Sequence, residues 1–380
     1  MKRIYWRPNR VSQLELVLVS ALAVGGLIAV ERFLVSEKQP AYETKLVAAK
    51  IAKRAFEQIH LERIRLQVPI DPEIDPAMSG IIGLPMSPIV SNTGSLPAKQ
   101  TSVNPNFAAV VVDMLDRAGV KQGDPIAIGT SGSFPALNTC VYAAAEALNL
   151  APVAIASVAA SQYGASHPQL TWLDMERVLR EQSITRIRSI AASRGGIHDR
   201  GDDHTEEGKL LLDEAIARSG IPKLDPATHE EAVSMRIEAF AGALKSGRYA
   251  AYINVGGGTA SVGTTEGKKK FKPGLNLRPP RNAVMPSVMR HFASQGIPVI
   301  HLVQVDQLAE RYGLPLHPTH TPEPGAGNVY FREVYNPWLV WGVLLAILAS
   351  LYATVRMDLG FRVLKGGSRK GPAKPPEQMV

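Results

Sequence analysis

The apolar positions of this chain form two long stretches near its ends, the first charge-free only over 16–30, and a series of short runs between them. Stretches 14–34 and 337–355 each have roughly the 20 residues that a helix needs to span a bilayer. The second is uncharged and begins with Trp338 and Trp341, and tryptophan favours the membrane interface. The first also fits the core of a signal peptide, but no small-residue cleavage site follows it. We therefore predict two transmembrane helices, the first an uncleaved anchor.

Short apolar runs typical of buried strands alternate with helical patterns between the two anchors. Strands are predicted at 126–128, 152–157, 185–192, 251–255 and 298–303. Helices are predicted at 105–118, 134–148, 172–180, 206–219, 227–245 and 282–294. This alternation predicts an α/β domain over 105–336, a doubly wound and mostly parallel sheet with helices on both faces.

The segment 35–104 departs from this alternation. Residues 42–66 form one long helical pattern rich in Ala, Lys, Glu and Leu, which indicates a stalk or a helix packed across the domain. Residues 68–105 are rich in Pro, Gly and Ser, a composition that interrupts helical and strand periodicity alike. We predict an ordered but irregular loop or a linker there.

Positive charge is concentrated in the two tails. The formal net charge is +8, and the tails 1–13 and 356–380 each carry +4, so the rest of the chain is close to neutral. By the positive-inside rule both termini face the cytoplasm, and 35–336 lies outside the plasma (inner) membrane. Basic tails beside a membrane favour anionic lipids, and not nucleic acid, as their partner. We predict a two-pass membrane protein with an extracytoplasmic, periplasmic domain.

Three loops rich in small residues each follow a predicted strand, at 129–133, 193–196 and 256–261. Since the carboxyl ends of parallel strands share one edge, these loops can meet there as a pocket of amide N–H groups and hydroxyls. With a guanidinium beside it, such a pocket suits a carboxylate or a phosphate. The candidate ligand-binding residues are Gly129, Thr130, Gly132, Arg194, Gly257, Thr259 and Ser261. The glycines could equally serve tight turns alone.

One loop concentrates positive charge within the otherwise neutral domain. Segment 267–281 contains Lys268, Lys269 and Lys270, with further basic residues and no acid. This loop could guide a polyanion or touch lipid headgroups, or it could simply be solvated.

A catalytic interpretation starts from Ser131 or Ser133 as the nucleophile, although their loop lacks the second glycine of a nucleophile elbow. His198 or His204 would be the base, oriented by an aspartate of the same segment. The segment 197–204, IHDRGDDH, could instead hold a divalent metal, or it could be a solvated loop.

Other candidate ligands are weak. His317 and His320 have a ligand-like spacing but no third ligand beside them. Cys140 is the only cysteine and lies in an apolar helical pattern, so we expect a buried thiol and no intrachain disulfide. We predict neither a metal nor a cofactor.

Several segments together resemble one known family. They are GTSGSFPALN at 129–138, the segment 191–216 (AASRGGIHDRGDDHTEEGKLLLDEAI), INVGGGTASVG at 253–263, the two flanking anchors and the basic segment that follows the second anchor. This combination resembles the bacterial poly-gamma-glutamate system protein, which accompanies the membrane components that make and export that polymer. The resemblance implies a role in capsule-type polymer biosynthesis, with other membrane subunits of that system as partners.

These observations lead to three hypotheses about function. In the first, the outer domain of a membrane-anchored accessory component binds or guides poly-gamma-glutamate or another anionic polymer. In the second, the domain is an extracytoplasmic serine hydrolase or transferase that acts on the amide bonds of the polymer. In the third, the chain is a purely structural subunit of a membrane complex.

Overall fold

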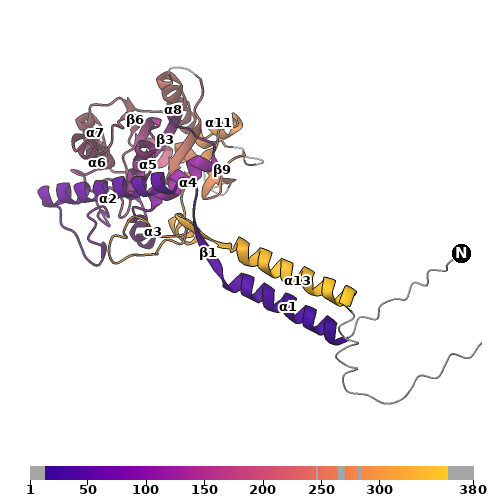
Figure 1. Ribbon diagram of the computed structural model, residues 1–380. Helices are drawn as coiled ribbons and strands as arrows, with labels where there is room; N and C mark the ends of the chain where they lie inside the picture. The colour runs from indigo at the N-terminus through magenta and orange to yellow at the C-terminus, as the bar shows by residue number, and fades with distance from the viewer. Residues whose placement is uncertain (1–12, 245–246, 264–269, 279, 281–284, 358–380) are drawn as a thin grey trace, which may run out of the picture. The chain divides into compact units, whose positions relative to one another are not determined.

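The computed structural model describes residues 13–244, 247–263, 270–278, 280 and 285–357 (Figure 1). Two compact units divide the chain. The smaller comprises 1–37 and 332–380, and the larger runs from Lys38 to Phe331.

The smaller unit contains two apolar helices, α1 (Gln13–Arg32) and α13 (Pro337–Met357). Both are long and apolar enough to cross a membrane, as predicted. The helices pack together at Gly26, where an added Cβ would overlap the side chain of Val343. Strands β1 (Leu34–Lys38) and β11 (Phe331–Tyr335) pair with each other, and Arg332 Nη2 lies 2.8 Å from Glu37 Oε2.

A seven-stranded sheet forms the centre of the larger unit, in the order β7-β6-β4-β3-β8-β10-β9. Its strands are β3 (Pro125–Ser131), β4 (Ala151–Ser157), β6 (Ser189–Ser193), β7 (Lys223–Leu224), β8 (Ala251–Val255), β9 (Gly274–Asn276) and β10 (Val299–Leu302). Every pairing is parallel except that of β9 with β10. The doubly wound, mostly parallel sheet predicted from the alternation of strands and helices is confirmed.

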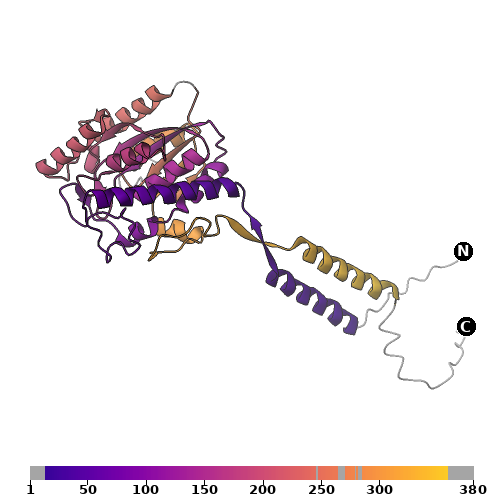
Figure 2. The same cartoon turned by 60° about the vertical axis from the view of Figure 1, so that its left-hand side comes forward.

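Helices cover both faces of this sheet because its central strands are apolar on both sides (Figure 2). Ile126 and Ile128 point to one core, with helices α2 (Tyr42–Arg65), α4 (Phe107–Arg117), α5 (Pro135–Ala147), α6 (Trp172–Glu181), α7 (Glu206–Ser219) and α12 (Val305–Arg311). Ala127 and Ile155 point to the other core, with α8 (His229–Ala243), α9 (Thr259–Val262) and α11 (Val288–Ser294). Successive side chains of a strand point to opposite faces of the sheet, so apolar residues are needed at successive positions when both faces are buried.

Helix α2 packs against the domain, the second of the two placements considered for it. Its Ala48, Ala52, Phe56 and Ile59 are buried in the first core. The compact unit therefore begins at Lys38, well before the boundary at 105 expected from composition.

Segment 68–104, expected to be an ordered but irregular loop or a linker, is part of the domain, which agrees with the first of these alternatives and not with a linker. It contains β2 (Val90–Asn92) and α3 (Leu96–Ser102), and β2 pairs in parallel with β5 (Ala160–Ser161). Gly83 approaches the carbonyl oxygen of Gly164 so closely that a Cβ would overlap it. Tertiary contacts of this kind order a stretch whose composition interrupts helical and strand periodicity.

Candidate functional site

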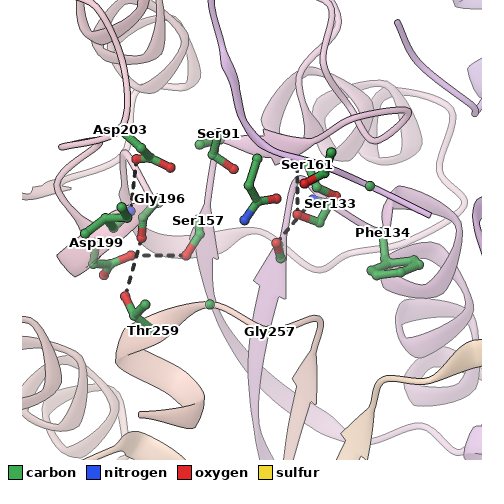
Figure 3. A pocket seen from close by; sticks show the side chains of 18 of the residues that line it. Ser91, Ser133, Phe134, Ser157, Ser161, Gly196, Asp199, Asp203, Gly257 and Thr259 are labelled. Carbon is green, nitrogen blue, oxygen red and sulfur yellow. Dashed lines mark hydrogen bonds between the residues drawn. The ribbon is translucent and has the colours of Figure 1, made fainter. Parts of the chain in front are cut away.

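A cavity of about 290 Å³ lies at the carboxyl edge of the sheet, where the strand order reverses between β3 and β8 (Figure 3). From β3 the chain moves outward to β4, β6 and β7, and it then returns to β8 on the other side of β3. In doubly wound sheets this switch point leaves a crevice outside the strand ends, because the flanking connections diverge there.

The structure brings the three predicted small-residue loops together around this cavity. Ser131 ends β3 and Ser133 follows it, Gly196 follows β6, and Gly257 and Thr259 follow β8. Two further segments complete the lining, and neither was predicted to belong to it. One is the β2–α3 segment, and the other is the connection from β4 to β5.

Lys99 of α3 is a buried cation whose ammonium group reaches the cavity wall. The residue is 2% exposed, and its Nζ donates to Ser161 Oγ at 2.9 Å and to the carbonyl oxygen of Ser133. Nζ also lies 3.9 Å from the ring centroid of Phe134. Removal from water lowers the pKa of Lys99 to about 7, so a large share of the amine is neutral near pH 7.

Three serines are held in fixed positions beside Lys99. The amide of Ser161 donates to Ser133 Oγ at 3.0 Å, and the amide of Ser133 donates to Ser131 Oγ at 3.2 Å. Asn138 of α5 fixes the loop by donating its Nδ2 to the carbonyl oxygen of Ser131 at 2.8 Å. Gly132, between Ser131 and Ser133, has no room for a Cβ, because that atom would overlap the carbonyl oxygen of Val158.

A buried ion pair supports the opposite wall of the cavity. Arg236 of α8 donates its Nε to Asp199 Oδ2 at 2.7 Å, and its Nη2 bonds both Ser157 Oγ and Ser193 Oγ. Burial alone would lower the pKa of Arg236, but the Asp199 carboxylate raises it above its usual value. The pair ties the short 3₁₀ turn η1 (Ile197–Asp199) to β4, β6 and α8, so it fixes this wall.

The histidines predicted as bases do not meet the predicted serines. The exposed ring of His198 lies with Nδ1 3.0 Å from Asp202 Oδ2, and it lines a separate cavity. The His204 side chain is fully buried, with Nδ1 3.2 Å from Asp203 Oδ1. Within the described part of the chain neither ring bonds a serine of the cavity.

The predicted anion-binding groups are also placed differently from expectation. Arg194 donates Nε and Nη2 to the Asp213 carboxylate at 2.8 and 2.5 Å, away from the cavity lining. This placement has a simple cause, since Asp213 of α7 neutralises the guanidinium. Lys268 and Lys269 lie outside the described residues, and Lys270 is exposed and does not line the cavity.

The remaining glycine-loop candidates have structural contacts. At Gly129 an added Cβ would lie 2.5 Å from the Tyr252 hydroxyl, and that hydroxyl is 3.3 Å from Ser261 Oγ. Thr130 is buried in β3. Gly129 of β3 and Ser261 of α9 therefore belong to the contact between the sheet and this helix, and neither lines the cavity.

Metal binding finds no ready donor set in the described residues. No group of three or more His, Cys, Asp or Glu side chains among them could hold an ion. His317 Nε2 lies 4.0 Å from Asp306 Oδ1, and His320 Nδ1 lies 3.5 Å from Thr319 Oγ1. Cys140 is buried, and its burial raises the pKa of the thiol.

Sequence reasoning missed Lys99 and Ser161, the two most closely coupled side chains of the cavity. The helix that carries Lys99 has a local signal, because Ser95 caps it and Pro97 stands in its first turn. No feature of the neighbouring sequence distinguishes a lysine whose side chain points into the protein from one whose side chain points to solvent. Comparison with known proteins adds no assignment, since no family model, curated protein or solved structure matches this chain.

Proposed function

We propose that the domain is a serine hydrolase or acyl transferase in which Ser161 is the nucleophile and Lys99 the general base. One observation supports this most directly, the 2.9 Å contact between Ser161 Oγ and an amine whose pKa burial lowers to about 7. A base with a pKa near the working pH combines a populated neutral form with a useful driving force for proton transfer. An adjacent general base activates serine in the same way in many acyl-transfer enzymes.

In the proposed reaction, neutral Lys99 accepts the hydroxyl proton of Ser161 as Oγ adds to the carbonyl carbon of an amide or ester. Protonated Lys99 then donates this proton to the departing amine or alcohol, which leaves an acyl ester on Ser161. Water, or an amine in a transfer, attacks this ester while Lys99 takes up its proton. The proton finally returns to Ser161 Oγ as the acyl group leaves.

The Ser133 hydroxyl is the group placed to stabilise the tetrahedral intermediate. Its Oγ accepts the Ser161 amide at 3.0 Å, so its own proton is free to be donated into the cavity. A fixed hydroxyl donor aimed at developing oxyanion charge lowers the barrier without reorganisation. Ser131 Oγ accepts the Ser133 amide at 3.2 Å and so fixes the conformation of this loop.

The resemblance to poly-gamma-glutamate system proteins suggests the polymer on which such an enzyme acts. An amide-linked anionic polymer offers carbonyl carbons to Ser161, and other membrane subunits would supply it. The accessory role of binding or guiding the polymer is supported by the exposed Lys270 and Lys272. Because Arg194 is bound to Asp213, the cavity itself favours acyl chemistry over capture of an anion.

The two apolar helices and the charge of the tails support a location for this chemistry. With +4 in each tail, both termini would face the cytoplasm and the catalytic domain would lie outside the plasma membrane. The basic tails would contact anionic lipids.

Labelling by a fluorophosphonate tests the proposal directly. The full chain in detergent micelles should be labelled at Ser161, as mapped by mass spectrometry, and Ser161→Ala and Lys99→Met should lose the label. Ser294→Ala serves as the matched control, because this hydroxyl bonds the His291 carbonyl outside the cavity. Labelling at Ser131 would reassign the nucleophile. No labelling, together with salt-sensitive binding of poly-gamma-glutamate, would favour the accessory role.

A further inference from the structure

The charges that line the cavity are unevenly balanced. Among the described residues, its charged lining consists of Lys99, Asp199 and Asp203. Asp199 is neutralised by Arg236, whose Nε lies 2.7 Å away. Asp203 therefore adds a negative charge that no arginine or lysine pairs with in the described chain.

Asp203 lies across the cavity from the proposed catalytic pair. Figure 3 shows its carboxylate on the side opposite Ser133 and Phe134, with Ser157 between them. Lys99 and Ser161 belong to the Ser133 side, because Lys99 bonds both serines. A substrate that reaches Ser161 with its carbonyl group can thus extend its other end toward Asp203.

One oxygen of Asp203 is occupied and the other is available. Oδ1 accepts the amide of Ile197 at 2.9 Å, and the buried His204 ring lies 3.2 Å from it. Among the described residues, no side chain and no amide other than that of Asp203 itself bonds Oδ2. Burial raises the pKa of Asp203, but His204 and the Ile197 amide together bring it below its usual value, so the carboxylate is ionised at neutral pH.

The rest of the lining selects for a small polar group. Hydroxyls dominate it, from Ser91, Ser95, Ser131, Ser133, Ser157 and Thr259. A volume of about 290 Å³ is at the lower end of small-molecule sites, and such a density of hydroxyls would be left unpaired by a fatty acyl chain.

We propose that the cavity binds an aminoacyl group with a free ammonium, which Asp203 Oδ2 receives while Ser161 attacks the acyl carbon. The enzyme then works from the amino-terminal end of a peptide or polyamide and does not cut within it. A charged hydrogen bond to a fixed carboxylate supplies this preference, because a blocked amine would leave Asp203 Oδ2 without a charged partner. The inference rests on the proposed function and specifies its substrate class.

Paired substrates test the inference in the full-length protein. Glycyl and γ-glutamyl amides of aminomethylcoumarin are compared with their N-acetyl counterparts by kcat/KM. The wild type should prefer the free amine by about tenfold or more, since a hydrogen bond between charged groups is worth at least that factor. Asp203→Asn should reduce the ratio to near one through loss of the free-amine reaction, while Asp202→Asn should keep it, because Asp202 does not line the cavity. Equal rates for both substrates in the wild type, or an unchanged ratio in Asp203→Asn, would overturn the inference.

A binding measurement separates this inference from the proposed function. In the Ser161→Ala variant, glycinamide should raise the melting temperature more than N-acetylglycinamide does, and Asp203→Asn in that background should abolish the difference. Fluorophosphonate labelling of Ser161 without any amine preference contradicts the inference alone. Amine binding without labelling contradicts the catalytic proposal and leaves an amine-binding cavity. A folded state of each variant is checked by its melting curve.

Discussion

Lys99 Nζ and Ser161 Oγ lie 62 positions apart in the sequence and 2.9 Å apart in space. The small sheet of β2 and β5 brings them together, since Asn92 of β2 is in register with Ser161 of β5. Helix α3 begins four residues after β2 and carries Lys99 as its fourth residue. The proposed catalytic pair therefore depends on a two-stranded sheet outside the central one.

The proposed reaction should be faster at higher pH. Its base is the neutral form of Lys99, whose pKa burial lowers from 10.5 to about 7. The rate of fluorophosphonate labelling should therefore rise with pH through about 7 and fall off below it. A rate that is flat between about pH 5.5 and 8.5 would show that another group activates the serine.

Lys99→Met should give an inactive but more stable protein. The unfolded chain binds a proton at this lysine up to about pH 10.5, whereas the folded chain releases it near 7. Stability of the wild type therefore rises with pH between these values, and the variant lacks this dependence. Near pH 7 the variant should gain about 2 kcal/mol, after allowance for two lost hydrogen bonds. Melting temperatures at pH 7 and 9.5 check this, and a gap that widens with pH would contradict it.

Breaking the buried ion pair of Asp199 and Arg236 should destabilise the domain strongly. Arg236→Met leaves the Asp199 carboxylate buried without its partner, a change that costs about 3–5 kcal/mol. The double variant with Asp199→Asn should recover part of this loss. Arg332→Met is the control, since its pair with Glu37 is exposed and is expected to contribute below about 1 kcal/mol. Denaturant unfolding of the wild type and the three variants measures the differences in the free energy of unfolding.

Gly196→Ala should impair the site beyond its effect on the backbone. Gly196 has φ 69°, and a Cβ there would also overlap Asp203 Oδ1. Gly123→Ala is a matched control, because Gly123 has φ 84° with open space around it. Both should lose about 1 kcal/mol from the strained conformation. Gly196→Ala alone should also lose amine selectivity, and equal selectivity in the two variants would argue against a role for Asp203.

Two adjacent glycines in α1 should differ in their tolerance of a larger side chain. Gly26→Leu would place its side chain against Val343 of α13, whereas Gly25 has open space around it. Close packing drives helix association in membranes, so Gly26→Leu should weaken the helix pair by about 1 kcal/mol or more and Gly25→Leu should not. Thermal stability of the full chain in micelles compares them, and equal melting temperatures would count against this contact.

Much of the central fold could be predicted from the sequence because its strands are buried on both faces. The run 251–255 coincides with β8 and the pattern 206–219 with α7. Strands β7 and β9 were missed, since two and three residues carry no readable period. Segment 68–104 was interpreted as irregular because its order comes from distant contacts, such as that of Gly83 with Gly164.

The site was only partly predictable. Convergence of the loops at 129–133, 193–196 and 256–261 follows from parallel strands, whose carboxyl ends share an edge. The identity of the reactive groups does not follow from this rule. Arg194 was expected in the cavity and is bound to Asp213, while Lys99 was overlooked because lysines in helices normally face water.

The short length of β7 and β9 also affects how readily two molecules can pair through the edges of their sheets. They form the two borders of the sheet, with two and three residues. A long bare border would offer its unpaired amide and carbonyl groups to any neighbour as a template for aggregation. Edges this short expose few unpaired groups, so they give two copies of this chain little length over which to pair strand to strand.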